Sequence, residues 1–471
     1  MDLPHFIIEE IFSYLTTEEQ SELLTTNKHV CETILKQLMK NLRISYPIAD
    51  SFYSITLPKF GSQVCSLELG YFNKKLMNHL SNVTSITVLE NYHDSVEQNI
   101  EDILDSYPKL IQLDLSQMLL QFDVASKVLN LQKLVSLQLP DFFSDPTQIS
   151  LFLNDLVTPS LRSLSLDMPL FSHQIVTIIA KNLPNLTYLS ISSEGLYGDH
   201  GKMLDVKFQH LKALSLVITG PNIPKDAIDF RLENFPSLTA LSFSPLVSFK
   251  VPAERTFPLV NELLIYQLDK KLILSTQELF PSLASLILIC KAICPKVVNE
   301  ALRIATSIES IKLYHVNDQS AFDDLPARQY RCHTFSLLTS CPVQSSFFRW
   351  LAPCFPHLHH LSIEFDPDSN ASFDAVPFEH QGPFNSLAIF EAAGRFPAIW
   401  IHQIIHYSPQ LDLLGLDMDL YSKHSRRFSA KYNSLNVVVS FAFDHEDLSS
   451  DSESESEFEV DFLSGSDSGS D

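Results

Sequence analysis

Glycine is scarce in this sequence, and the motifs that would indicate an enzyme are missing. Only 11 of the 471 residues are glycine, and no glycine-rich nucleotide loop, Walker motif or Gly-x-Ser-x-Gly nucleophile elbow occurs. No set of residues combines a nucleophile, a base and an oxyanion hole. We therefore expect no catalytic residues, no enzymatic activity and no cofactor.

The seven cysteines are odd in number and scattered. This usage favours reduced thiols, and so a cytoplasmic or nuclear protein. Cys290 and Cys294 lie four residues apart, but no second Cys or His pair with zinc-like spacing lies near them in the sequence. His357, His359 and His360 have no accompanying carboxylate motif, so we expect ordinary surface side chains. No metal site is predicted.

Long apolar runs and a secretory signal are absent too. No stretch of about 18 uncharged apolar residues occurs, so no membrane span is expected. The first residues have neither the basic n-region nor the continuous apolar h-region of a signal peptide. The formal charge is −23, and an acidic surface repels phosphate backbones. We therefore expect neither nucleic acid nor a membrane as a partner.

What the sequence does contain is a repeat, apolar-x-x-apolar-x-apolar, which recurs about 16 times at intervals of about 25 residues. Eight copies carry a proline two residues before the first apolar position, where it stops a helix and starts an extended segment. The copies are Val64-Leu67-Leu69, Val83-Ile86-Val88, Leu110-Leu113-Leu115, Leu134-Leu137-Leu139, Leu161-Leu164-Leu166, Leu186-Leu189-Ile191, Leu211-Leu214-Leu216, Leu238-Leu241-Phe243, Val260-Leu263-Ile265, Leu283-Leu286-Leu288, Ile308-Ile311-Leu313, Cys332-Phe335-Leu337, Leu358-Leu361-Ile363, Phe384-Leu387-Ile389, Leu411-Leu414-Leu416 and Tyr432-Leu435-Val437.

The spacing within each copy predicts a stacked architecture. The second and third apolar residues are two apart, so both point inward from a short strand. The remaining residues suffice for a helix or an irregular return, and Phe171, Ile175 and Ile179 have helical spacing. Stacked copies would share one core that no single copy could enclose. The sequence therefore predicts an α/β right-handed solenoid, with parallel strands on the concave face and helices outside.

This pattern resembles the leucine-rich repeat over roughly residues 50 to 443, and the resemblance implies a protein-binding solenoid. In such a chain the residues between the inward positions face the concave wall. Over the early and central copies these residues are small and polar: Gln112, Asp114, Ser163, Ser165, Ser190, Ser215 and Ser242. In the next three copies they become Leu264 and Tyr266, Ile287 and Ile289, and Lys312 and Tyr314.

Apolar and aromatic side chains clustered on an exposed wall normally mark a partner site. The sequence therefore predicts a protein-substrate platform from Leu264 to Tyr314. Two alternatives stay open. Another part of the chain could cover these residues, or the register could be off by one residue, which would turn the whole set inward.

Residues 1–45 follow a different pattern, with apolar residues at helical spacing and capping residues between them. Pro4 suits the first turn of a helix, Thr17 and Gln20 can cap a second helix, and a third would carry a stripe from Val30 to Leu42. Three helices of this length enclose little core. They therefore need a partner surface, either the solenoid or another protein.

Leu3-Pro4 followed by Ile7-Ile8, Ile11-Phe12 and Leu15 resembles the opening of the F-box, with Phe6 where that family usually has Glu. The resemblance implies that these helices bind the Skp-type adaptor of a cullin–RING ubiquitin ligase while the repeats hold an unknown protein substrate. The residues that the resemblance assigns to the adaptor contact are Leu3, Pro4, Ile8, Ile11, Phe12 and Leu15. The alternative is that the helices only cap the first repeat, in a free-standing scaffold or inhibitor without a ligase.

The last segment, residues 444–471, holds eleven Asp or Glu and no Lys or Arg, and such a composition cannot fold alone. Ser450, Ser452 and Ser454 each have Glu three residues later, as in casein-kinase-type acceptor sequences. The apolar residues from Phe458 to Leu463 are either a docking motif or part of a solubilising tail. The expected domains are thus an F-box-like helical domain at 1–45, a solenoid at 46–443 and a disordered acidic tail at 444–471.

Overall fold

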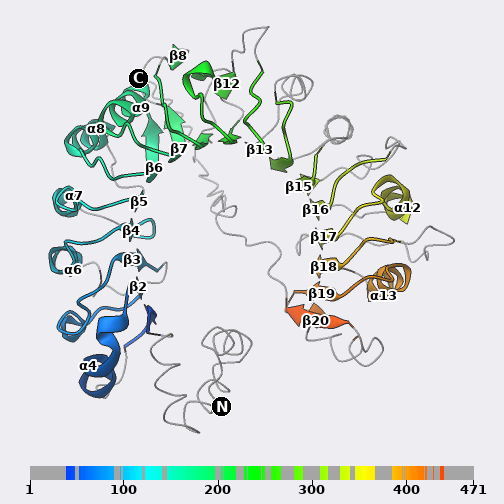
Figure 1. Ribbon diagram of the computed structural model, residues 1–471, viewed down its shortest axis with the longest axis horizontal. Coiled ribbons are helices and arrows are strands. Elements are labelled where there is room, and N and C mark those ends of the chain that lie inside the picture. Colours follow the sequence, from blue (N-terminus) through cyan, green and yellow to red (C-terminus); the bar gives the residue numbers. More distant parts are fainter. Residues whose placement is uncertain are drawn as a thin grey trace, which may run out of the picture.

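The computed structural model describes residues 39–47, 52–89, 96, 99–118, 122–140, 146–196, 203–204, 206–218, 228–230, 232–244, 247–249, 256–266, 280–289, 308–316, 329–339, 345–365, 384–394, 396, 398–417, 420–421, 428 and 435–439. These residues form an arc in which strands line the inner side and helices lie along the outer side (Figure 1). The architecture is a leucine-rich-repeat solenoid with one long sheet.

The inner sheet has 17 strands. Every strand pairs in parallel with the strand of the next repeat, so the order in space follows the order along the chain. The strands are β1 (Asn41–Ile44), β2 (Ser66–Leu69), β3 (Ser85–Val88), β4 (Gln112–Asp114), β5 (Ser136–Leu139), β6 (Ser163–Phe171), β7 (Tyr188–Leu196), β9 (Ala213–Ile218), β11 (Ala240–Phe243), β13 (Glu262–Tyr266), β14 (Ser285–Ile289), β15 (Ser310–Val316), β16 (Thr334–Thr339), β17 (His360–Phe365), β18 (Ile389–Ala393), β19 (Leu413–Leu416) and β20 (Asn436–Val439).

The inward residues of the repeat confirm the predicted core. Leu164 and Leu189, for example, pair across β6 and β7 and are fully buried. Burial alternates with partial exposure along most of these strands, as expected when one face of a sheet packs against a core and the other faces solvent. Stacked copies therefore share one continuous hydrophobic core.

Two of the predicted copies are out of register. Phe390 and Ala392, not Leu387 and Ile389, pair with Leu361 and Ile363 of the preceding strand. The predicted copy is displaced by three residues because Phe384 and Leu387 are buried and also three apart.

The last predicted copy is displaced by two residues. Val437 and Val439, not Leu435 and Val437, pair with Leu414 and Leu416. A shift of two residues keeps the alternation of faces, so the pattern alone does not expose it.

The prolines occupy tight turns that precede the strands. In Pro184-Asn185-Leu186, the backbone N–H of Leu186 donates to the carbonyl oxygen of Leu183, 3.2 Å away. The same bond closes the turn before every one of the eight proline-bearing copies. Proline suits the second position of such a turn because its fixed φ matches it and its missing N–H is not required. Pro108, Pro184 and Pro409 each follow the end of a helix within two residues and precede a strand, as predicted.

The outer layer is helical in two stretches of the arc. Ser172 caps the start of one helix, where its hydroxyl accepts a hydrogen bond from the Gln174 backbone N–H, 3.3 Å away. Ile175 and Ile179, which were predicted to be helical, lie in this helix and are buried. The helices are α4 (Leu57–Phe60), α6 (Ile100–Ser106), α7 (Phe122–Val128), α8 (Pro146–Asp155), α9 (His173–Asn182), α12 (Ser345–Cys354) and α13 (Ala398–Tyr407). Shorter helical turns are η1 (Phe52–Thr56), η2 (Gly61–Gln63), η3 (Lys74–Leu76) and η4 (Leu232–Asn234).

Between these stretches, part of the outer layer is a second sheet. It consists of β8 (Met203–Leu204), β10 (Ile228–Phe230) and β12 (Val247–Phe249), which pair in parallel. These strands lie on the outer side of the repeats that carry β7, β9 and β11. Among the helices that the structure describes, none is long and apolar enough to cross a membrane.

The stack begins earlier in the sequence than predicted. Met39 and Leu42, expected on the stripe of a third N-terminal helix, belong to the repeat of β1 and are buried in the solenoid core. Leu42 and Ile44 pair with Leu67 and Leu69 of β2. The prediction of a helix at Leu42 is therefore wrong, because the spacing of Met39, Leu42 and Ile44 also fits the repeat.

Candidate protein-binding site

The six residues predicted to form a platform lie side by side on three consecutive strands. Across β13, β14 and β15, Leu264 pairs with Ile287 and Ile287 with Lys312. Tyr266, Ile289 and Tyr314 form the adjacent row in the same way. Hereafter these six residues are called the platform.

The register of the platform has the predicted parity. The neighbours Leu263, Leu286 and Leu313 are buried in the core, whereas Leu264, Ile287, Ile289, Lys312 and Tyr314 are partly exposed. Because successive side chains of a strand point to opposite faces, these five side chains lie on the wall away from the core. A register error of one residue is thereby excluded for these strands.

The neighbouring wall differs in chemistry but not in backbone. Ser165, Ser190, Ser215 and Ser242, called here the serine wall, form one row across β6, β7, β9 and β11. This row continues directly into the platform, since Ser242 pairs with Leu264. The concave wall therefore changes from hydroxyl groups to branched aliphatic side chains within a single step between strands.

Beyond the platform the concave wall is polar and largely buried. Ser336, Ser362 and Glu364 on β16 and β17 are 5%, 2% and 5% exposed. His360 Nε2 lies 2.7 Å from Glu391 Oε2 of β18. The sequence did not indicate this pair, because its two residues are 31 positions apart. Only the parallel pairing of β17 with β18 brings them together.

His357 and His359 lie in the turn before β17, and their side chains are exposed, as predicted. The ring of His333 lies 5.3 Å from that of His359 and 6.3 Å from that of His357. Within the described part of the chain, no group of three or more His, Cys, Asp or Glu side chains could hold a metal ion.

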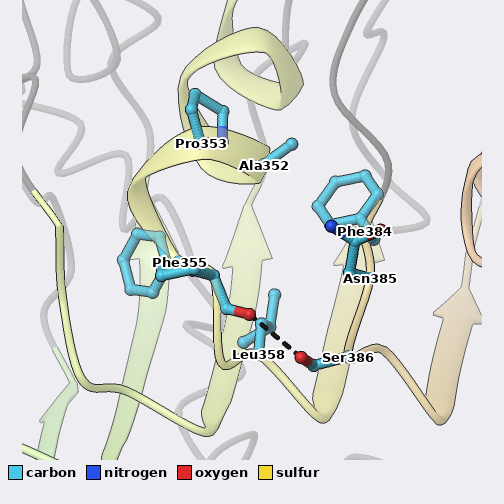
Figure 2. A pocket seen from close by; sticks show the side chains of 8 residues that line it. Ala352, Pro353, Phe355, Leu358, Phe384, Asn385 and Ser386 are labelled. Carbon is cyan, nitrogen blue, oxygen red and sulfur yellow. Dashed lines mark hydrogen bonds between the residues drawn. The ribbon is translucent and has the colours of Figure 1, made fainter.

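A small pocket of about 200 Å³ lies where the end of α12 meets the turn before β18. Figure 2 shows Ala352, Phe355, Leu358 and Phe384 around it. At its floor the Ser386 hydroxyl donates to the Pro356 carbonyl oxygen, 3.0 Å away. This bond links one repeat to the next, so the pocket is a gap between stacked turns.

The electrostatics of the described residues serve the stacking of repeats. On the outer side Lys74 pairs with Asp102 at 2.8 Å and Lys127 with Asp105 at 2.6 Å, and the hydrogen bond from Lys74 lowers the pKa of Asp102. In the core, burial raises the pKa of the Cys332 thiol to about 12. Buried thiols with such values are unreactive.

Several predicted site residues lie outside the described residues. These are the adaptor-binding set Leu3, Pro4, Ile8, Ile11, Phe12 and Leu15 and the phosphorylation set Ser450, Ser452 and Ser454. Cys290 and Cys294, for which no metal site is predicted, also lie outside the described residues.

No family model and no curated protein matches this chain. Solved structures with a similar arrangement include TLR13 in complex with ssRNA13, with 15% identity over 74% of this chain and a TM-score of 0.38. The circular leucine-rich-repeat protein CroV588 shares 15% identity over 78% of this chain, with a TM-score of 0.34. This chain spans 55% and 58% of the length of those two proteins.

A third similar structure is the Leptospira interrogans leucine-rich-repeat protein LIC12759, with 15% identity over 84% of this chain and all of that one, at a TM-score of 0.29. The parallel pairing of the strands and the burial of the repeat positions, both described above, give the conclusion: the chain is a leucine-rich-repeat solenoid.

Proposed function

We propose that this solenoid binds a protein partner on the platform of β13, β14 and β15. The observation that carries the proposal is the partial exposure of Leu264, Ile287 and Ile289 on the wall opposite the core. Apolar side chains in this position gain free energy when a partner removes them from water, at roughly 25 cal/mol per Å². Tyr266 and Tyr314 belong to one row with Ile289, and tyrosine is enriched in protein interfaces.

We further propose that the bound protein is a ubiquitination substrate. In this proposal the chain is the substrate-recognition subunit of a cullin–RING ubiquitin ligase in the cytoplasm or nucleus. The support comes from the sequence, where Leu3-Pro4, Ile8, Ile11-Phe12 and Leu15 resemble the F-box ahead of a leucine-rich repeat. The Skp-type adaptor is then the partner of the N-terminal helices. Ser450, Ser452 and Ser454 would be phosphorylated, which would add charge to an already acidic segment.

A pull-down with purified Skp-type adaptor tests the ligase role. Wild-type chain should retain the adaptor, and an Ile11→Asp, Leu15→Asp variant should lose it, because a buried carboxylate in an apolar contact is strongly unfavourable. Ser13→Asp adds a carboxylate on the polar side of the same predicted helix and should leave binding unchanged. Circular dichroism spectra should coincide for all three proteins.

Absence of adaptor binding by the wild type would contradict the ligase role. It would favour the alternative, a free-standing scaffold or inhibitor whose N-terminal helices cap the first repeat. The platform proposal would be unaffected, because it rests on different residues.

A further inference from the structure

Lys312 gives the platform a positive charge that its row on the concave wall otherwise lacks. The row runs in register from Glu68 on β2 through Ile287 to Val438 on β20, and the structure describes every position in it. Lys312 is the only basic residue among these positions. It is partly exposed, and the ion pairs formed by described residues do not include it. A ligand of the platform can therefore place an acidic residue here, beside Ile287.

Ser242 offers a hydrogen-bond donor at the opposite border of the platform, where it pairs with Leu264. Its hydroxyl oxygen is buried and has no hydrogen-bond partner. Its neighbours Leu241 and Phe243 are buried in the core, so the Ser242 side chain points to the concave side. A chain bound across the platform can therefore place a backbone carbonyl oxygen here as the acceptor.

The sequence after β20 contains a segment that matches these requirements. Residues 457–463, Glu-Phe-Glu-Val-Asp-Phe-Leu, alternate acidic and apolar side chains up to Phe462, and they lie outside the described residues. In an extended chain Phe458, Val460 and Phe462 share one face and cover about 13 Å at about 3.3 Å per residue. The three platform strands extend over about 10 Å, two steps of about 4.8 Å. The three apolar side chains therefore match the width of the platform.

This segment can reach the platform of its own chain. β20 ends at Val439, six steps between strands from β14, or about 29 Å at the usual strand spacing. Phe458 is 458 − 439 = 19 residues further along the chain, and an extended chain of that length spans about 63 Å. An approach from β20 meets β15 before β14 and β13, so Glu457, just ahead of Phe458, arrives on the side of Lys312.

The net charge favours this contact within one chain over the same contact between two chains. At −23, two copies repel each other. A segment tethered to its own binding site acts at an effective concentration on the order of 1 mM. Contact within the chain therefore needs only a modest intrinsic affinity.

We propose that residues 458–463 bind the platform of their own chain, with Glu457 beside Lys312, so that a protein partner must displace them. Phe458, Val460 and Phe462 cover the apolar side chains, and the bound backbone accepts a hydrogen bond from Ser242. The segment thereby regulates access to the site. This inference rests on the proposed platform.

Fluorescence anisotropy with a labelled synthetic peptide of residues 455–463 tests the proposal on the full chain. A Phe458→Ser, Phe462→Ser double substitution disables the chain's own segment, so this variant should bind the peptide. Wild-type chain should bind it at least about tenfold more weakly, because its own segment competes at the tethered concentration. Adding Ile287→Asp to the double variant should abolish binding. Ser215→Asp, which places the same carboxylate on the serine wall, should leave it unchanged.

The predicted contact of Lys312 with Glu457 supplies a second readout. In the double variant, Lys312→Gln should weaken peptide binding about two- to fivefold, as expected for a partly exposed ion pair. The same substitution should have no effect on a peptide that carries Glu457→Gln, because the pair is then already broken. Circular dichroism spectra should coincide for all variants.

No binding of the peptide by the double variant, equal binding by wild type and double variant, or binding that Ile287→Asp leaves unchanged would overturn the proposal. So would a wild-type dimer that the double substitution dissociates, measured by light scattering, since the segment would then bind a second copy. Photo-crosslinking at Ile287 in the double variant separates this inference from the proposed function. Adducts with a partner protein, without peptide binding, would leave the platform proposal standing and refute the contact with residues 458–463.

Discussion

The serine wall and the platform are built on the same sheet and differ in the side chains on its concave face. Beneath both, the inward residues are aliphatic and buried, as at Leu214 and Leu286. On the concave face of the same strands, Ser215 gives way to Ile287 three strands later. The residues that face the core therefore hold the repeats together, and the residues on the concave face can vary to bind a partner.

This division predicts that inward substitutions affect stability far more than outward ones. Leu288 is fully buried between Ile265 and Leu313 of adjacent strands, so Leu288→Ala should lower the free energy of unfolding by about 2–5 kcal/mol. Ile287→Ala, one residue earlier on the concave wall, should lower the free energy of unfolding by less than about 1 kcal/mol. Urea denaturation followed by circular dichroism measures both. Equal losses would contradict the division.

A backbone substitution at the end of β18 should have the next largest effect on stability. Gly394 has a φ of 71°, and a Cβ there would collide with the carbonyl oxygen of Phe365. We expect Gly394→Ala to lower the free energy of unfolding by at least about 1–3 kcal/mol. Repeats contact mainly their neighbours. Hydrogen exchange should therefore show reduced protection near β17 to β19 and unchanged protection at β6 and β7.

Ala393→Gly is the control for this substitution, since it alters the neighbouring residue without a collision. A similar loss of stability in both variants would show that the conformation of Gly394 is not the cause.

The turn prolines should contribute less to stability than Leu288 or Gly394. Pro281 lies in the turn that leads to Leu283 on the platform side, and Pro184 in the turn that leads to Leu186 beneath the serine wall. Pro281→Ala and Pro184→Ala should each lower the free energy of unfolding by about 0.4–1 kcal/mol, mainly through greater freedom of the unfolded chain. Thermal denaturation of both variants should give similar shifts, because the turns share one geometry. A much larger shift at one turn would show that the two regions differ in their backbone as well.

At neutral pH the smallest expected effect on stability comes from Cys332, whose contribution changes only at alkaline pH. Burial raises its pKa from 9.0 to about 12, so the folded chain keeps a proton that the unfolded chain releases. The free energy of unfolding should therefore fall as the pH rises from about 9 towards 12. Cys332→Val removes this contribution, and the stability of the two proteins should converge or cross as the pH increases. Parallel pH profiles would contradict the predicted shift.

Much of this fold could be predicted from the sequence, because the repeat is defined by apolar residues that are all buried in the core. The platform register followed from alternation, and the structure confirms it at Ile287 and Ile289. The errors arose where two patterns coincide. Met39 and Leu42 have a spacing that suits a helix as well as the repeat, and Phe384 imitates the first residue of a copy.

The contact between His360 and Glu391 could not be predicted in the same way. These two residues belong to different repeats, and the segment between them has no fixed length from one repeat to the next. Contacts between strands depend on register, which a sequence pattern fixes only within each repeat. The burial of Ser362 likewise depends on the assembled wall and not on its local sequence.

Site-specific photo-crosslinking in cells tests the central claim most directly, that the platform and not the serine wall holds the protein partner. A benzoylphenylalanine placed at Ile287 should form covalent adducts with a partner protein, and the same residue at Ser215 should form few. A second substitution, Ile289→Asp, should abolish the adducts formed from position 287. Adducts at position 215 but not at 287 would contradict the account.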